Sequence, residues 1–298
     1  MQTFDDYKYF AEVNGIDVTD LTEMEAQDAP QWFDDDEIME PWVSKIDDTD
    51  LTSQGSGKLA ILLHGFNPFG RHPFTQDEAN AGRYADYQLF FDKLKQRLAK
   101  QGYTSVVASY DTFETFKDGG KKLARIFKGW TNYDLSKTII VAYSMGGLVA
   151  RQMVLEGMPF ARLYTTCTPH GGTMPYLMNN VFGQYYFNFN RGSASMGPGS
   201  RDIRTLNRSD QHLHHKYYCH GVNFTDFRLF QNNDTITDCD RATMVGSRIA
   251  YRWATHIGLL STVDPMPFQP HLRGYSDKKE WFTGRWAPTE FINRVDGV

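Results

Sequence analysis

A serine flanked by small residues lies in the middle of the chain, in the order Ala142-Tyr143-Ser144-Met145-Gly146-Gly147. The pattern is a variant of G-x-S-x-G in which Ala142 replaces the first glycine. Small neighbours are needed because a nucleophile at such a turn has strained backbone angles, with the preceding strand and the following helix packed close to it. A serine held there can attack an acyl carbonyl once an imidazole takes its proton. We therefore predict that Ser144 is a nucleophile, with a helix-capping serine as the alternative.

A second segment with a chemical role is Leu63-His64-Gly65-Phe66-Asn67, at the end of an apolar run. Gly65 allows the backbone to bend toward the serine, so that the N–H of Phe66 can pair with the N–H of Met145. Two such N–H groups form an oxyanion hole, which stabilises the negative charge on the attacked carbonyl oxygen. We interpret His64 as structural rather than catalytic.

Three segments, the serine elbow among them, carry a resemblance to a known family. Residues 142–151 resemble the elbow of the α/β-hydrolase lipases, particularly the bacterial lipases whose elbow begins with Ala and relatives of the GPI inositol-deacylase type. The run Thr168-Pro169-His170-Gly171-Gly172-Thr173 is similar to the Thr-Pro-His-x-Gly-Thr that follows the next strand in those lipases. Met196 to Ser200, continuing to Leu206-Asn207, is similar to their Met-x-Pro-Gly-Ser…Leu-Asn segment. The motifs occur in the order found in the family.

The resemblance also implies an acid and a base, which follow the serine in chain order. Asp234 lies in a segment similar to the family's Asp-x-Val-Val/Ile-Pro loop, although Thr237 stands where proline is usual. Asp226, Asp238 and Asp240 lie nearby, so Asp226 and Asp238 in particular stay alternatives. His256 begins a run, His256-Ile257-Gly258-Leu259-Leu260, that resembles the family's His-x-x-Leu-Leu.

The expected activity is that of a serine carboxylic ester hydrolase, a lipase, esterase or phospholipase that acts through an acyl-enzyme. The Ser144–His256–Asp234 triad calls for no metal or organic cofactor. We expect a small-molecule or lipid ester as substrate, bound against His64, Gly65, Tyr143 and His170. An acyltransferase, thioesterase or peptidase could use the same triad, because the fold does not determine the leaving group. A binding protein on this fold that has lost its activity is a further alternative.

The elements that would position these residues begin at Lys58, where apolar runs alternate with amphipathic segments. Such alternation predicts a mostly parallel central sheet with helices on both faces, the α/β-hydrolase fold. We expect strands at 59–63, 104–110, 138–142, 162–168, 217–224 and 247–253, and helices at 85–101, 117–129 and 148–155. A segment of about 40 residues, 173–215, has little periodicity and is rich in aromatic residues, so we expect a cap or lid before the acid-bearing strand. Its aromatic residues would form an apolar wall for an acyl chain or simply pack within the segment.

The charge of the chain divides it into two parts. Residues 1–57 carry 16 acidic residues and two lysines, a net charge of −14, whereas residues 58–298 have a net charge of +9. We predict an acidic N-terminal extension, a partly ordered arm, followed by the catalytic domain at 58–298, and opposite charge should draw the two together. The basic residues are scattered rather than massed, so we do not expect nucleic acid as a partner. Contact with an anionic lipid surface is an alternative use of this charge.

Composition excludes several other classes. The chain has no apolar run near the ~18 residues of a membrane-spanning helix. Its first residues lack the basic and apolar stretches of a secretory signal, so we expect a cytoplasmic location, with export by a route that needs no signal peptide as the alternative. Cys167, Cys219 and Cys239 match no zinc or redox spacing, and we interpret His212, His214 and His215 as ordinary surface histidines. The sequence makes no prediction of oligomeric state.

Overall fold

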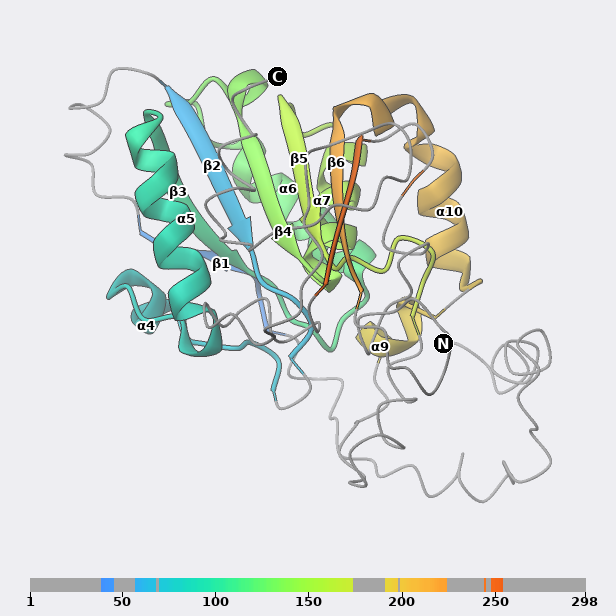
Figure 1. The fold of residues 1–298 in the computed structure, drawn as a ribbon. Helices are drawn as coiled ribbons and strands as arrows, with labels where there is room; N and C mark the ends of the chain where they lie inside the picture. Colours follow the sequence, from blue (N-terminus) through green and yellow to red (C-terminus); the bar gives the residue numbers. More distant parts are fainter. Residues whose placement is uncertain are drawn as a thin grey trace.

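A computed structural model describes residues 39–45, 57–67, 70–173, 191–197, 199–223, 244 and 248–253. Its centre is a seven-stranded sheet in the order β1-β3-β2-β4-β5-β6-β7 (Figure 1). The strands are β1 (Trp42–Val43), β2 (Lys58–Leu63), β3 (Tyr103–Ser109), β4 (Ile139–Tyr143), β5 (Arg162–Thr166), β6 (Tyr217–Asn223) and β7 (Arg248–Trp253). Strands β2 to β7 are parallel, and β1 pairs antiparallel with β3. The mostly parallel sheet predicted from the sequence is confirmed.

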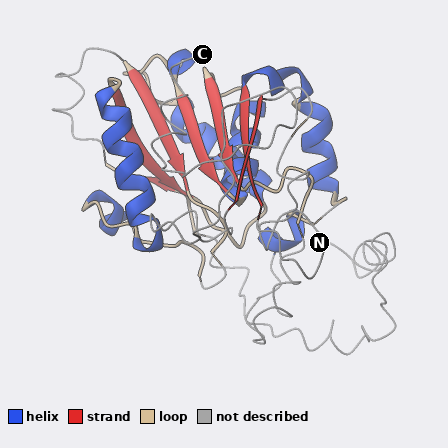
Figure 2. Cartoon of the chain, in the orientation of Figure 1, coloured by secondary structure: helices blue, strands red, loops and turns tan. Residues whose placement is uncertain are grey.

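Helices connect the strands and cover both faces of the sheet (Figure 2). The α-helices are α4 (Gln76–Asn80), α5 (Gln88–Lys100), α6 (Phe116–Lys128), α7 (Met145–Leu155), α9 (Arg191–Ser195) and α10 (Arg201–Ser209). Short 3-10 helices are η1 (Ala85–Tyr87), η2 (Leu135–Lys137) and η4 (Gln211–Lys216). None of the helices in the described part of the chain is long and apolar enough to cross a membrane.

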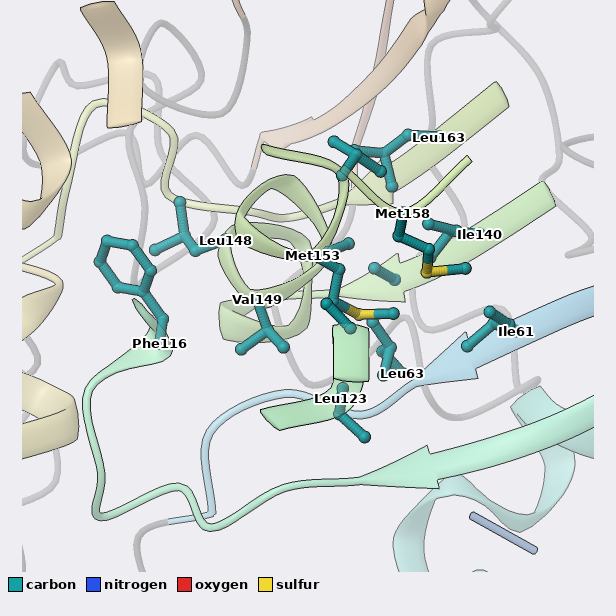
Figure 3. Close-up of a cluster of buried hydrophobic side chains, with 14 of the residues drawn as sticks. Ile61, Leu63, Phe116, Leu123, Ile140, Leu148, Val149, Met153, Met158 and Leu163 are labelled. Carbon is teal, nitrogen blue, oxygen red and sulfur yellow. The ribbon is translucent and has the colours of Figure 1, made fainter. Parts of the chain in front are cut away.

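Alternate residues of β2 belong to two separate hydrophobic cores. Leu59, Ile61 and Leu63 face α6 and α7, in a core that also holds residues of α10. Figure 3 shows Ile61 and Leu63 in this core. Ala60 and Leu62 face α5 on the other side of the sheet. A strand buried on both faces has no polar positions, which explains the continuous apolar run in the sequence.

Helices α6 and α7 pack closely against each other at Gly120. A Cβ atom on Gly120 of α6 would lie 2.6 Å from Cβ of Gln152 and 2.8 Å from the carbonyl oxygen of Val149 on α7. Only a residue without a side chain allows the two backbones to come this near. Thr115 caps the N-terminus of α6, and its hydroxyl accepts a hydrogen bond from the N–H of Asp118.

Element boundaries differ from the predicted ones where local backbone geometry intervenes. The strand predicted at 162–168 ends at Thr166, because Cys167 adopts a φ of 54° that no strand can continue through. The helix predicted at 148–155 begins earlier, at Met145, directly after the serine. Strand β1 was not predicted: two residues are too few to show an alternating pattern.

Part of the segment predicted as a cap, 173–215, lies among the described residues. Ile203 and Leu206 of α10 lie in the same core as α7, so this helix is part of the body. The N–H of Thr173 donates to the carbonyl of Met196 (2.8 Å), so the two ends of the intervening segment meet. Residues 174–190 lie outside the described residues, and a lid there stays a prediction.

Candidate active site

Ser144 stands between the end of β4 and the first residue of α7, with φ 51° and ψ −127°. A positive φ is uncommon for a residue with a side chain and is often found where function requires a strained turn. The turn is held from below by a hydrogen bond from the N–H of Ser144 to the carbonyl of Thr166 on β5 (2.8 Å). This is the strand–turn–helix geometry that the sequence predicts for a nucleophile elbow.

Three glycines allow other segments to approach this turn. A Cβ atom on Gly65 would lie 2.8 Å from Cβ of Ser144 and 2.9 Å from Cδ1 of Tyr143. One on Gly146 would lie 2.3 Å from the carbonyl oxygen of His64, and one on Gly147 would lie 2.1 Å from Oγ1 of Thr168. The elbow is therefore packed directly against the loop that follows β2. A side chain at Gly65 or Gly146 would force the elbow and this loop apart, and one at Gly147 would strike Thr168.

Phe66 and Met145 each bring a backbone N–H to this contact. Met145 is the first residue of α7, where the N–H has no acceptor within the helix, and Phe66 follows Gly65, which touches Ser144. Neither N–H donates to another group in the part of the chain that the structure describes. The helix dipole adds a partial positive charge at Met145. Both are suited to binding a developing oxyanion.

His64 fixes the direction of the Phe66 N–H. Its Nδ1 lies 2.7 Å from the carbonyl oxygen of Gly65, which can only accept, so Nδ1 carries the proton. The peptide joining Gly65 to Phe66 is planar and trans, so holding its carbonyl also sets where its N–H points. The carbonyl of His64 accepts from the Tyr110 hydroxyl (2.9 Å), and the N–H of Gly65 donates to the Tyr87 hydroxyl (3.0 Å).

The His64 ring is fully buried and stacked on Tyr110, with centroids 4.4 Å apart. Burial lowers its pKa from 6.5 to about 3. A neutral imidazole that cannot take up a proton near neutral pH is a poor general base, in agreement with the structural interpretation of this residue. Any part it takes in substrate binding goes through the backbone of Gly65 and Phe66.

His170 is likewise buried and lies in a polar network around Arg151 of α7. Its Nε2 lies 3.0 Å from Oγ1 of Thr165, and its Nδ1 lies 3.3 Å from Arg151. Burial and then the nearby guanidinium hold the pKa of His170 well below its usual range. Arg151 also forms two hydrogen bonds to Asp210, at 2.7 and 2.9 Å, with both side chains fully buried. The network joins α7 to the segment after α10.

Four of the predicted residues are thus brought together: Ser144, Met145, Gly65 and Phe66. Tyr143 is buried beside Gly65, so it supports the loop from below. Asp234 and His256 lie outside the described residues, as do Asp226 and Asp238, and their roles stay predictions. Among the described residues, no group of three or more His, Cys, Asp or Glu could hold a metal ion.

The supporting residues were missed in the sequence: Tyr87, Tyr110 and Ser109 around His64, and Asp210 beside Arg151. A hydroxyl or carboxylate that acts by reaching another strand leaves no local pattern. Arg151 is the last residue of the elbow segment 142–151. A cation in a largely apolar helix indicates a buried partner, because unpaired charges are rarely buried.

Comparison with known proteins shows the fold. The sequence matches no protein-family profile and no curated protein sequence. The structure is similar to that of the lipase BlEst2 from Bacillus licheniformis in its mature form, with a TM-score of 0.53 and 17% identity over 74% of this chain and 92% of the other. The same lipase in its propeptide form gives a TM-score of 0.52 and 16% identity, over 76% of this chain and 52% of the other. The predicted α/β-hydrolase fold is confirmed.

Proposed function

We propose that the protein is a serine carboxylic ester hydrolase of the lipase or esterase type. The observation that carries the proposal is the close contact of Ser144, at a strained turn, with Gly65, the residue that precedes Phe66. A nucleophile and an oxyanion hole side by side are the two parts that acyl transfer needs most. The similar fold of a bacterial lipase supports the same class of reaction.

In the proposed reaction, Oγ of Ser144 attacks the acyl carbonyl of an ester while His256 takes its proton. The carbonyl oxygen becomes an anion and accepts hydrogen bonds from the N–H groups of Phe66 and Met145. His256 then gives its proton to the leaving alcohol, and the acyl group stays on Ser144. Water attacks this acyl-enzyme with His256 again as base, which releases the acid and restores the serine. Asp234 would hold His256 in the tautomer that this cycle requires.

Substitution of Ser144 tests the proposal directly. Ser144→Ala should abolish hydrolysis of p-nitrophenyl esters and covalent labelling by a fluorophosphonate probe. It should leave the thermal unfolding temperature nearly unchanged, because it removes only a hydroxyl and keeps the Cβ and the backbone of the turn. The matched control is Ser136→Ala, an exposed serine in η2, which should leave both activities intact. Hydrolysis retained by Ser144→Ala would overturn the assignment. Absence of labelling in the unaltered protein would favour the binding-protein alternative.

The acid and base need separate variants. His256→Ala should remove labelling and hydrolysis together, because without a base the hydroxyl stays a weak nucleophile. Asp234→Asn should lower kcat by about 10⁴-fold, the effect of losing the correct tautomer in a triad. Asp226→Asn and Asp238→Asn are the controls: if one of them gives the large loss and Asp234→Asn does not, the acid has been misassigned.

A panel of substrates would define the substrate class. We propose a small-molecule or lipid ester, and contact with a lipid surface would be favoured by the basic balance of residues 58–298. Phospholipids and p-nitrophenyl esters of different acyl length, each assayed with and without detergent, would separate a lipase or phospholipase from an esterase. Thioester or amide substrates cleaved faster than esters would favour the thioesterase or peptidase alternative.

A further inference from the structure

The hydrogen bonds that hold the Gly65–Phe66 peptide continue to a second histidine, His72. Because Nδ1 of His64 donates to Gly65, its Nε2 must accept, and Oγ of Ser109 lies 2.8 Å away as the donor. The Ser109 oxygen is in turn 2.6 Å from Nδ1 of His72, so that ring nitrogen donates to it. Three hydrogen bonds, all running in one direction, therefore lead from His72 to the carbonyl of Gly65.

The N-terminal strand holds both His72 and Ser109 in place. Trp42 of β1 is the backbone partner of Ser109, and its ring stacks on the imidazole of His72, with centroids 6.0 Å apart and planes at 27°. The Trp42 ring also contacts Phe74, with ring centroids 5.8 Å apart. Phe74 in turn packs edge-on against the ring of His64. In the part of the chain that the structure describes, the bond to Ser109 is the sole hydrogen bond of the His72 ring, because its Nε2 has no partner.

Two further contacts fasten this strand near the same loop. The N–H of Met39 donates to Oδ2 of Asp111 (3.2 Å), which also pairs with Arg71 at 2.7 Å, the residue before His72. Ser44 exchanges two hydrogen bonds with Val107 of β3, at 2.8 and 2.9 Å. The strand is thus held on both sides of Trp42.

We propose that Trp42 and His72 are positioning residues for catalysis. Through them, residues 39–45 of the acidic extension fix the plane of the Gly65–Phe66 peptide and therefore the direction in which the Phe66 N–H points. The inference rests on the proposed function. It gives the N-terminal segment a part in the active site although none of its residues touches the serine in the described structure. An oxyanion donor whose direction wanders stabilises the transition state less, while substrate binding in the ground state is little changed.

Three variants test this assignment. Trp42→Ala removes the ring over His72, and His72→Phe keeps a ring for Trp42 but has no N–H to give Ser109. Each should lower kcat for a p-nitrophenyl ester by about tenfold, a fraction of the 10²- to 10³-fold lost with a whole oxyanion donor, with KM unchanged within twofold. His72→Asn places an amide N–H at the position of Nδ1 and should restore most of kcat.

The control is Trp130→Ala, which removes an equally large ring that packs on Phe127 in the last turn of α6, with centroids 4.9 Å apart. It should lower the thermal unfolding temperature as Trp42→Ala does but leave kcat unchanged. The inference is overturned if Trp42→Ala and His72→Phe keep full kcat, or if His72→Asn is as impaired as His72→Phe. Failure of the proposed function itself looks different, because the unaltered protein would then show no hydrolysis dependent on Ser144.

Discussion

The buried ion pair between Arg151 and Asp210 allows a quantitative prediction. Arg151 forms four hydrogen bonds in the core: two to Asp210, one to Asn207 at 2.7 Å and one to His170. Both charged side chains have no solvent exposure. Arg151→Met would leave the Asp210 carboxylate buried, with His214 and Tyr217, at 3.0 and 3.1 Å, as its remaining side-chain donors among the described residues. Breaking such a pair by removing one partner costs about 3–5 kcal/mol of unfolding free energy.

Removing both charges should cost much less than the two single changes together. Asp210→Leu should also cost about 3–5 kcal/mol, because it leaves the guanidinium unpaired. In Arg151→Met with Asp210→Leu no charge is left buried, and we expect the double variant to be at least as stable as either single variant. Urea unfolding followed by tryptophan fluorescence gives all four free energies.

A matched control separates burial from proximity. Lys137 and Asp134 lie 2.9 Å apart, nearly the same distance, but their side chains are 61% and 43% exposed. Lys137→Met should leave the urea midpoint unchanged, because solvent screens this pair. If the costs of Arg151→Met and Asp210→Leu simply add in the double variant, the pair is not coupled, and the reasoning from burial is wrong. Should the single variants not fold, Asp210→Asn keeps one acceptor and allows the same comparison.

Two further predictions concern the glycines and His64. Gly146→Ala should abolish ester hydrolysis even if the protein folds, because its Cβ would lie 2.3 Å from the carbonyl oxygen of His64. Gly82→Ala is the control: its Cβ would meet nothing within 4 Å, so it should lower the unfolding free energy by only about 1 kcal/mol, for its positive φ, and keep full activity. Full activity in Gly146→Ala would contradict the packing. Acid should destabilise the protein through His64, whose pKa falls from 6.5 to about 3 on folding. The folded state binds its proton more weakly than the unfolded state, so this contribution is complete above pH 6.5 and is lost as the pH falls toward 3, by about 3 kcal/mol at pH 4.5. His64→Asn should flatten the fall in unfolding free energy between pH 6.5 and 4.5, and an unchanged slope would show that another group is responsible.

Local sequence was enough to predict the elements that carry the site and the contact between them. The elbow around Ser144 and the loop at Gly65 are short motifs whose residue types are set by backbone geometry, and parallel strands bring their ends to one edge of the sheet. Tyr87, Tyr110 and Ser109 could not be found in this way. Each acts through one hydroxyl on a group far away in the chain, and such a contact depends on strand register and on side-chain packing, which follow from the whole fold.

The N-terminal strand was missed for a different reason. Residues 39–45 lie in a region whose acidic composition predicts an extension rather than a strand. The two residues of β1, Trp42 and Val43, are too few to show the alternating pattern of a strand. The strand forms because the backbone of β3 can pair with it and because the Trp42 ring packs on His72 and Phe74. Both conditions belong to the body of the protein and not to the segment.

Strand β1 has a consequence for the behaviour of the protein in solution. It pairs with the outer edge of β3 at Ala108 and Ser109. Next to it, Ser44 forms hydrogen bonds with both the N–H and the carbonyl of Val107. The run Tyr103-Thr-Ser-Val-Val-Ala-Ser109 has no charged residue and consists largely of β-branched and small residues, the kind of exposed strand that pairs with another molecule. By occupying the end of that strand, a few residues of a highly charged extension keep its hydrogen-bonding groups from a second copy. Loss of this segment should therefore appear first as concentration-dependent light scattering, before any change in helix content.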